Sequence, residues 1–456
     1  MRLLLLLLLG LSPLLSPAAD PPRFQEGDYQ LDVIRISGKE PGLTALVFGG
    51  IHGDEPGGYF SSELLAHIRL RRGNLIIVPR VNFPSIMLGR REVAGDMNRK
   101  FAGQVGAADP ERRVVEALKR LMGEADLFVN LHDAMGFHRR KYQSKTRNPD
   151  MYGQCLIVDT GKFQSRRLSR EIDLEAVGAR IVAAGNALIP DAGHHFEFWN
   201  HNSIQKDTQF PEMKKSATHF ALTEFSIPAF GLEASKDLPT LDLKVHYQLV
   251  MIQAILTEFG FEFDLPEIDL VPSRLSWVEF RKNDGERLRL SGQSNLRARI
   301  GDRLTVVGVQ AHPDAGVSAD LLGFGSLNDI GREWRVSRAA NLVLKRNSVI
   351  IGRIYIRPFR PDSIQRIELA IADRPRTVSN WAVVEMPTAG EARWLGLAPV
   401  AGKITLARHD PAGDTAQVPA GAWKVGLEDF PERERTMEFR IYADGKLAGG
   451  IWFDRP

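Results

Sequence analysis

Strand-like and helix-like segments alternate along the first 266 residues, and this alternation restricts the fold more than any other feature of the sequence. Residues 43–48, 75–81 and 127–131 are short apolar runs, whereas residues 111–122 and 243–259 have the spacing of helices. Strands that alternate with helices pair into a sheet whose faces the helices cover. We therefore predict an α/β fold with a mixed, largely parallel sheet flanked by helices.

The pattern changes after Pro266. Residues 304–309, 348–356 and 439–442 look like strands, and turns rich in Gly, Asp, Asn and Pro separate such segments. Many short strands with turn signals indicate all-β modules. At about 100–200 residues per domain, the chain has room for a catalytic domain and two smaller modules. We expect the catalytic domain over 20–266, a β-barrel-like domain over 267–361 and an Ig-like β-sandwich over 362–456.

The first nineteen residues have the layout of a secretory signal peptide. Arg2 supplies a positive charge, residues 3–15 are mostly apolar, and small residues follow at 16, 18 and 19. A membrane-spanning helix needs about 20 apolar residues, and Pro13 and Pro17 interrupt this segment early. We predict cleavage after residue 18 or 19, export, and no stable insertion in the membrane.

Composition narrows the class of partner and the compartment. The formal net charge is +3, and no run of Lys and Arg is long enough to indicate nucleic acid as a partner. A modest positive charge favours an anionic partner such as a cell-wall polymer. Cys155 is the single cysteine, which excludes an intrachain disulfide. An exported protein without disulfides fits a bacterial periplasm.

A candidate metal site begins where the first apolar run ends. Residues 43–48 lead into Gly49-Gly50-Ile51-His52-Gly53-Asp54-Glu55. Ligands of open α/β sheets collect at the carboxyl ends of the strands, and the glycines let the chain bend so that His52 and Glu55 face one ion. An imidazole and a carboxylate suit Zn²⁺, which needs a third protein ligand in a catalytic site. His132 follows the run 127–131 and is our candidate; a core histidine satisfied by Asp133 is the alternative.

The pattern formed by His52 and Glu55, a His followed three positions later by a Glu, occurs a second time from His194 to Glu197. No buried strand precedes that copy, so we interpret it as a substrate-facing or structural loop. The roles of His194, Glu197 and the nearby His201 stay open.

Other chemistry-bearing residues lie between and after these ligands. Arg91, Asn98 and Arg99 offer donors suited to a carboxylate, although a basic surface patch would look similar. Glu233 ends the apolar run from 229 and could take a proton from zinc-activated water. Glu224 is its rival, but it precedes that run.

These motifs carry a family resemblance. The segments His52-Gly53-Asp54-Glu55, Asp96-Met97-Asn98-Arg99-Lys100-Phe101, Asn130-Leu131-His132 and Leu232-Glu233 resemble the successive motifs of carboxypeptidase A-type zinc peptidases. The spacing from Arg91 to Arg99 resembles the aspartoacylase and succinylglutamate desuccinylase branch. The resemblance covers roughly residues 30–260 and implies the zinc carboxypeptidase fold.

A closer resemblance is to the peptidoglycan DL-carboxypeptidases that determine helical cell shape. It rests on the signal peptide, Leu131-His132-Asp133 followed by Gly136-Phe137, the segment 229–236 and the trailing β modules. That enzyme carries Gln at the first zinc-ligand position, where this chain has His52.

The resemblance implies a role for each site residue. His52, Glu55 and His132 would bind zinc, and Glu233 would act as general base and then general acid. Arg91 would steady the oxyanion, while Asn98 and Arg99 would hold the substrate's terminal carboxylate.

The implied substrate is a peptidoglycan muropeptide. Zinc-dependent hydrolysis of the D-Glu–meso-diaminopimelate bond of muramyl tripeptide would release a dipeptide. We expect the basic stretch 138–147 to hold the second carboxylate of diaminopimelate, or else to be a solvated loop. A deacylase of small N-acyl amino acids and a non-enzymatic wall-binding scaffold are the alternatives. The sequence leaves the oligomeric state and the role of the β modules open.

Overall fold

The computed structural model describes most of the chain. It covers residue 29 and residues 31–455, except 266–269, 284, 324–326, 360–365, 381, 387–390, 399–403, 410–413, 416, 431–435 and 444–445. The predicted signal peptide lies outside the described residues. Within them, no helix is both long enough and apolar enough to cross a bilayer.

An eight-stranded sheet forms the centre of the α/β module, which we define as the described residues up to 265. Its main path runs β1-β3-β2-β4-β11-β7-β10, with β12 on β3. The strands are β1 (Ile34–Ser37), β2 (Glu40–Phe48), β3 (Arg69–Val78), β4 (Leu127–Ala134), β7 (Cys155–Val158), β10 (Glu197–Asn200), β11 (Ala229–Ser235) and β12 (Glu262–Asp264). The central strands β3, β2, β4 and β11 are parallel. The predicted fold class is therefore confirmed.

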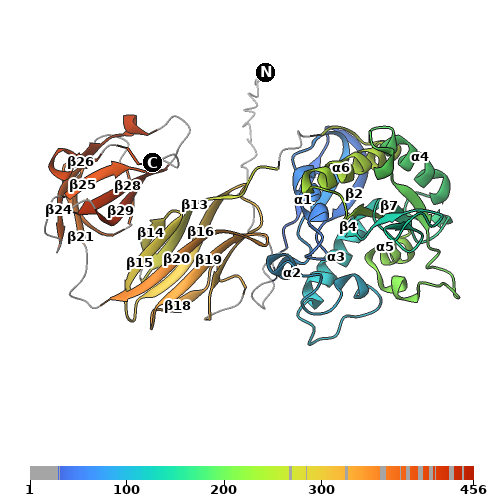
Figure 1. The fold of residues 1–456 in the computed structure, drawn as a ribbon, viewed down its shortest axis with the longest axis horizontal. Helices are drawn as coiled ribbons and strands as arrows, with labels where there is room; N and C mark the ends of the chain where they lie inside the picture. The colour runs from blue at the N-terminus through green and yellow to red at the C-terminus, as the bar shows by residue number, and fades with distance from the viewer. Residues whose placement is uncertain are drawn as a thin grey trace, which may run out of the picture.

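Helices cover both faces of this sheet (Figure 1). One face carries α1 (Pro56–Leu65), α4 (Leu174–Asn186) and α6 (Leu241–Glu258); the other carries α3 (Arg112–Glu124) and α5 (Ala217–Phe225). The central strands are buried on both faces, so Leu46, Val47, Phe128 and Val129 have no exposed surface. This explains why they read as continuous apolar runs rather than as alternating patterns.

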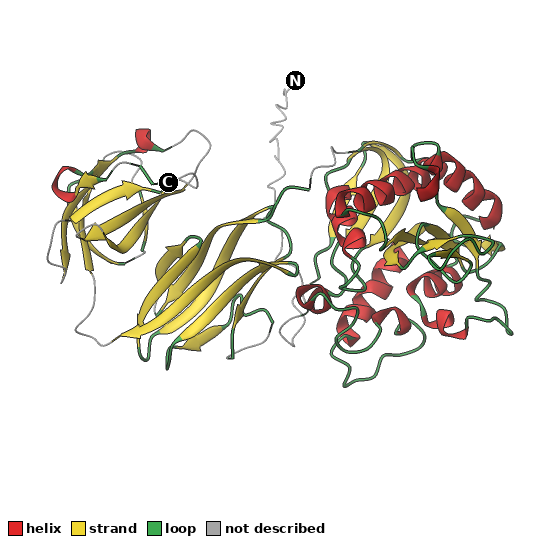
Figure 2. Cartoon of the chain, in the orientation of Figure 1, coloured by secondary structure: helices red, strands yellow, loops and turns green. Residues whose placement is uncertain are grey.

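In the remainder of the described chain, the regular secondary structure is almost entirely strand, joined by loops (Figure 2). The middle β module contains β13 (Arg274–Lys282), β14 (Glu286–Leu290), β15 (Gln293–Arg299), β16 (Arg303–His312), β17 (Val317–Leu321), β18 (Glu333–Arg335), β19 (Ala340–Arg346) and β20 (Val349–Phe359). They form two four-stranded sheets around one apolar core.

The C-terminal β module also has two sheets. One pairs β22 (Arg374–Ser379), β21 (Arg366–Ile371), β24 (Ala392–Ala398) and β27 (Lys424–Val425). The other pairs β23 (Val383–Glu385), β29 (Lys446–Asp454), β28 (Thr436–Ala443), β25 (Ile404–Arg408) and β26 (Val418–Pro419). These two sheets enclose a third core.

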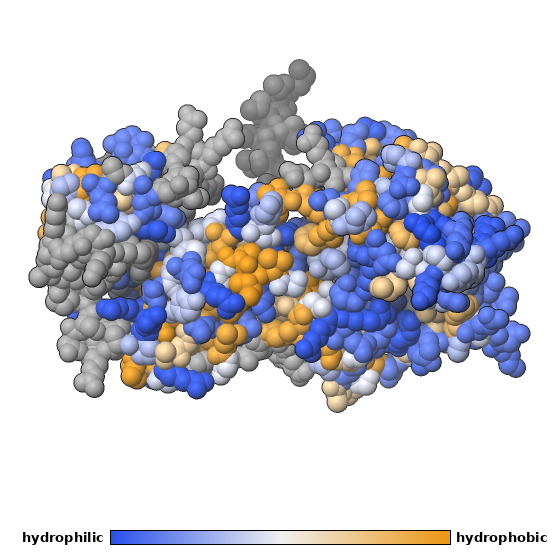
Figure 3. Space-filling model, in the orientation of Figure 1, coloured by the Kyte–Doolittle hydropathy of each residue, from blue (hydrophilic) through white to orange (hydrophobic). Residues whose placement is uncertain are grey.

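Buried arginines join the modules. Arg346, at the end of β19, donates to Glu63 of α1, and Arg80 donates to the same carboxylate. Arg80 also donates through Nε to Asn347 Oδ1, 2.8 Å away. At the second junction, Arg289 of β14 binds Glu279 within its own module and Asp454 of β29, with Nη1 2.6 Å from Asp454 Oδ1. In Figure 3, hydrophobic residues gather over the middle module and its border with the mostly hydrophilic α/β module.

Candidate active site

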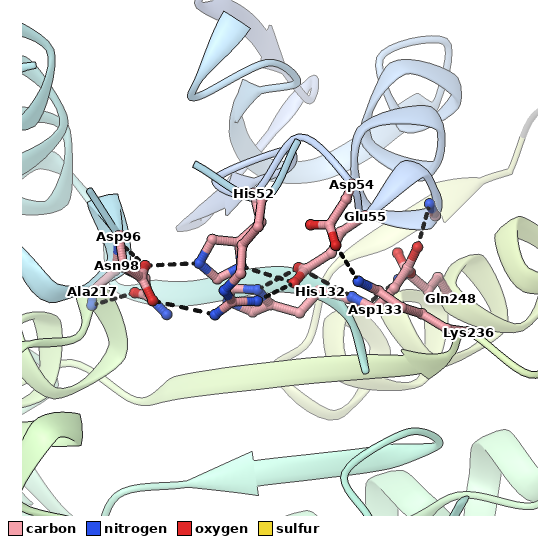
Figure 4. Close-up of polar contacts among 12 residues, drawn as sticks. His52, Asp54, Glu55, Asp96, Asn98, His132, Asp133, Ala217, Lys236 and Gln248 are labelled. Atoms are coloured by element: carbon pink, nitrogen blue, oxygen red, sulfur yellow. Dashed lines mark hydrogen bonds and ion pairs between the residues drawn. The ribbon is translucent and has the colours of Figure 1, made fainter. Parts of the chain in front are cut away.

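Three predicted metal ligands meet at the carboxyl ends of β2 and β4. His52 lies in the turn after β2, Glu55 lies directly before α1, and His132 lies near the end of β4. Nδ1 of His52 is 2.8 Å from Glu55 Oε1, and Nδ1 of His132 is 2.9 Å from Glu55 Oε2. All three side chains are buried, and their ligand atoms lie within 4.8 Å of one another (Figure 4). Two imidazole nitrogens and a carboxylate are a donor set that suits zinc.

The three side chains of the cluster shift one another's pKa values. Burial raises the pKa of Glu55, but the charges of His52 and His132 outweigh it and hold that pKa well below its usual value. Burial lowers the pKa of His52, yet Glu55 and the hydrogen bond to Asp96 raise it to about 9. Glu55 is thus an anion, and a cation is favoured beside it.

Asp96 orients His52, a role that we did not predict. Nε2 of His52 donates to Asp96 Oδ1 over 2.8 Å, which leaves Nδ1 for the cluster. Asp96 also accepts the backbone N–H of Asn98 at 2.9 Å and so begins the short helix Met97–Arg99. A carboxylate behind a histidine ligand fixes the ring and its tautomer.

Asp133 and Gln248 support the start of α1. Asp133 Oδ2 accepts the N–H of Gly57 over 2.8 Å, and Gln248 Nε2 donates to Asp133 Oδ1 over 3.0 Å. Burial raises the pKa of Asp133 to about 7, although Lys244 opposes the rise. These contacts connect the carboxylate to the helix that begins beside Glu55. His132 has its own partner in Glu55, so the alternative of a core histidine satisfied by Asp133 is not what the structure shows.

Glu233 lies beside the cluster on β11. The register of β11 and β4 pairs Glu233 with His132, and both side chains line the same cavity. Burial, reinforced by the negative charge of Glu55, raises the pKa of Glu233 well above its ordinary value. The rival Glu224 is exposed on α5 and does not line this cavity.

The predicted carboxylate-binding residues also reach the cavity. Arg91 contacts Glu55 Oε1 at 2.9 Å, and its side chain is 46% exposed, so it can turn toward a ligand. Asn98 Oδ1 accepts the N–H of Ala217 at 3.0 Å. This bond uses the acceptor end of the amide and leaves the donor end for a ligand. Arg99 lines the same wall.

The cavity has a volume of about 500 Å³ and extends beyond the predicted residues. Its further wall includes Asn130, Trp199, His201 and Phe210. Trp199 makes edge-on contacts with His201 and Phe210, at ring-centroid distances of 5.4 and 5.1 Å. Asn130 could have been found from the sequence, because it lies two residues before His132 and therefore faces the same side of its strand.

Two other predicted features lie away from the cavity. His194 of the second His–Glu copy stacks on Phe137, and its Nδ1 is 3.2 Å from the hydroxyl of Tyr247. The stretch 138–147, which we expected either to hold a carboxylate or to be a solvated loop, does not line the cavity. Arg139 and Arg147 instead donate to the backbone carbonyl of Gly193, over 2.7 and 2.6 Å.

Comparisons with known proteins identify the family of the chain. Residues 32–278 match the family described as the catalytic part of the carboxypeptidase controlling helical cell shape. Over 103 residues the chain is 37% identical to N-alpha-acetyl-L-2,4-diaminobutyric acid deacetylase of Halomonas elongata. That match spans 20% of this chain and 28% of the length of the relative.

Solved structures resemble the chain over nearly its whole length. The tripeptide-bound cell shape determinant Csd4 of Helicobacter pylori has a TM-score of 0.60 at 21% identity, covering 94% of this chain and 100% of that one. The mDAP-bound form of Csd4, described as a D,L-carboxypeptidase, has a TM-score of 0.59 at 21% identity, covering 93% and 100%. These likenesses show that the folds are the same. Because the family match covers more than half of the residues, the chain belongs to the carboxypeptidases that control helical cell shape, and it is a metallocarboxypeptidase.

Proposed function

We propose that the chain is a zinc-dependent peptidoglycan D,L-carboxypeptidase of the bacterial periplasm. It hydrolyses the bond between D-glutamate and meso-diaminopimelate in muramyl tripeptide and releases muramyl dipeptide and free diaminopimelate. One observation carries the proposal. A single cavity brings together the His52–Glu55–His132 cluster, the buried Glu233 and the donors of Arg91, Asn98 and Arg99.

The three clustered side chains would hold the metal. Bound zinc supplies Lewis-acid activation of water and of the scissile carbonyl. His52 presents Nδ1 because Asp96 engages its Nε2, and His132 presents its own Nδ1. Glu55 supplies the negative charge of the donor set.

Glu233 moves the proton. Hydrolysis adds the oxygen of water to the carbonyl carbon and breaks the C–N bond, so a proton must pass from the water to the departing amine. A carboxyl group whose pKa is raised by burial holds that proton at neutral pH more readily than a solvated one. Glu233 therefore acts first as base and then as acid.

Arg91, Asn98 and Arg99 position the substrate. The carboxylate next to the scissile amide marks the terminal residue, and guanidinium and amide N–H groups bind a carboxylate in fixed geometry. Arg91 starts beside Glu55, where it can also stabilise negative charge on the carbonyl oxygen.

Mass analysis of defined muropeptides tests the proposal. Purified protein loaded with one zinc per chain should convert the diaminopimelate tripeptide to dipeptide, and a chelator should stop the reaction. His132→Ala should lose zinc as well as activity. Wild-type metal content in both His52→Ala and His132→Ala would remove the metal assignment, and an intact tripeptide would remove the substrate.

A deacylase is the second candidate, and the match to the Halomonas elongata deacetylase favours it. Rapid hydrolysis of a small N-acyl amino acid by a protein that leaves the tripeptide intact would support it.

Export is a separate part of the proposal. N-terminal sequencing of the mature protein from its own cell should begin near residue 19 or 20. A cytoplasmic protein that keeps Met1 would contradict both export and a wall substrate.

A further inference from the structure

Asn130 is a buried polar side chain without a partner. It has no exposed surface, and neither its Oδ1 nor its Nδ2 has a hydrogen-bond partner. Buried amides are almost always hydrogen-bonded in proteins, so an exception needs a reason. Asn130 lines the active-site cavity, and the proposed catalytic steps do not use it.

The position of Asn130 locates it relative to the metal cluster. It lies two residues before His132 on β4, so the two side chains are on the same face of the sheet. Its neighbour on β11 is Gly231, which also lines the cavity. A Cβ at Gly231 would meet nothing closer than Ile157 Cβ at 3.7 Å, so the space beside Asn130 is open. This part of the cavity lies along both strands before His132 and Glu233.

His201 adds a second unpartnered atom to the same cavity. Its side chain is 5% exposed, its Nε2 is 3.7 Å from Asp159 Oδ1, and its Nδ1 has no hydrogen-bond partner. Burial lowers the pKa of His201, which keeps the ring neutral. If the carboxylate of Asp159 draws the ring proton to Nε2, Nδ1 is an acceptor.

We propose that Asn130 and His201 determine specificity by binding the far amino-acid end of the departing residue, an ammonium and a carboxylate on one carbon. Asn130 Nδ2 donates to the carboxylate, and Asn130 Oδ1 and His201 Nδ1 accept from the ammonium. The inference rests on the proposed function and extends it, because it assigns the second carboxylate to neutral groups on the sheet rather than to the basic stretch 138–147.

Variants of Asn130 and His201 are expected to differ in their activity on a tripeptide in which lysine replaces diaminopimelate. Lysine has the ammonium of diaminopimelate but lacks its second carboxylate. Asn130→Leu keeps the size of the side chain and removes both the donor to the carboxylate and one acceptor of the ammonium. It should lower kcat/KM on the diaminopimelate tripeptide by tenfold or more, with a smaller loss on the lysine tripeptide, which loses only the ammonium contact. His201→Phe removes only an acceptor for the ammonium and should lower kcat/KM on both tripeptides by similar factors.

Stability separates this role from a structural one. Leucine in place of an unpartnered buried amide removes an unsatisfied group, so the unfolding midpoint of Asn130→Leu should equal or exceed that of the wild type. A structural asparagine would give a lower midpoint. Met213→Leu changes an apolar group on the wall of the same cavity and should keep the preference between the two tripeptides.

Calorimetry with free meso-diaminopimelate and free lysine gives a readout that does not depend on hydrolysis. Asn130→Leu should weaken binding of diaminopimelate, which loses two contacts, more than binding of lysine, which loses one. If the wild type cleaves the tripeptide but Asn130→Leu keeps the full preference for diaminopimelate, the inference is overturned and the proposed function stands. If the wild type cleaves no tripeptide, the proposed function fails. The inference then depends only on whether Asn130→Leu weakens the binding of free diaminopimelate.

Discussion

Asp96 shows how much one carboxylate can organise around a candidate metal ligand. It accepts from His52 Nε2, from the backbone of Asn98 and from Arg91, whose Nη2 is 3.2 Å away. It therefore links a candidate metal ligand to two residues that line the cavity. Its side chain is 21% exposed, so it lies outside the hydrophobic core. Its contacts therefore order the site rather than contribute to core packing.

We expect Asp96→Ala to keep the fold and to weaken zinc binding by about 10–100-fold, as loss of a partner behind a histidine ligand does. The ring of His52 would lose the contact that fixes Nδ1 toward Glu55. Competition with a chelator measures the change. Asp96→Asn retains an acceptor oxygen and should recover part of the affinity; equal losses in both variants would mean that the negative charge is what matters.

Glu233→Gln should bind zinc normally and lose activity, since the amide keeps the shape of the carboxyl group but cannot carry the proton. General acid–base catalysis contributes about 10²–10⁴-fold, and a loss of that size is expected in kcat. Glu224→Gln is the control, because Glu224 is exposed and outside the cavity. An inactive Glu224 variant beside an active Glu233 variant would reverse the assignment.

Asp159 predicts a pH dependence of stability. Burial raises the pKa of this carboxyl, but hydrogen bonding, to His219 first and then to Ser203, outweighs burial and lowers it. A lowered folded-state pKa means that the stabilisation is present above the unfolded pKa of about 3.9. It is lost as the pH falls through the folded-state value. Between pH 6 and pH 3, the urea midpoint should therefore fall more for the wild type than for Asp159→Asn.

At the scale of elements, the turn between β2 and α1 delivers two of the three clustered ligands. It passes so close to α2 (Phe83–Leu88) that a Cβ at Gly53 would lie 2.0 Å from the backbone carbon of Ser85. The backbone of Ser85 cannot move aside as the end of a flexible side chain can. Glycine is therefore required between His52 and Glu55 by packing rather than by a left-handed φ.

Gly53→Ala should displace the turn and separate His52 from Glu55. We expect loss of zinc binding together with a lower thermal midpoint, measured by metal analysis and calorimetry. Gly106→Ala is a matched control, because a Cβ there meets no atom within 4 Å. Full zinc content in Gly53→Ala would show that the turn tolerates the shift.

The elements also show how far sequence reasoning reaches. The apolar runs of the parallel strands predicted the sheet, and strand ends predicted where His52, His132 and Glu233 would converge. His201 follows the short strand β10, whose residues are all only partly buried, so it had no apolar run to mark it. Asp96 was visible only as part of a motif, since its contact with His52 spans 44 residues. Local periodicity carries no information about such partners.

At the scale of the whole molecule, the modules meet through charged groups removed from water. Glu63 and Arg346 are separated by 283 residues, and the side chains of Arg80 and Arg346 are 2% and 3% exposed. Tyr59 also reaches across this junction to Ser348. The middle module thus contacts the helix that begins beside Glu55.

Arg346→Met should lower the free energy of unfolding by about 1.5–3 kcal/mol, the value of a hydrogen bond to a charged group. Arg80 would still pair with Glu63, so the loss should be smaller than for Glu63→Ala, which leaves two buried cations without their anion. Urea unfolding measures both. Arg357→Met, on the exposed part of β20, should change stability by less than about 0.5 kcal/mol.

The junction between the α/β module and the middle module also determines which apolar surface a shortened chain would expose. Tyr59, Phe83, Ile86 and Met87 form a small apolar cluster against which Leu327 of the middle module packs. A chain that ended at Pro266 would present this cluster to solvent beside a carboxylate that had lost Arg346. Contiguous apolar surface of this kind promotes self-association. By covering these side chains, the middle module would therefore also limit self-association of the α/β module.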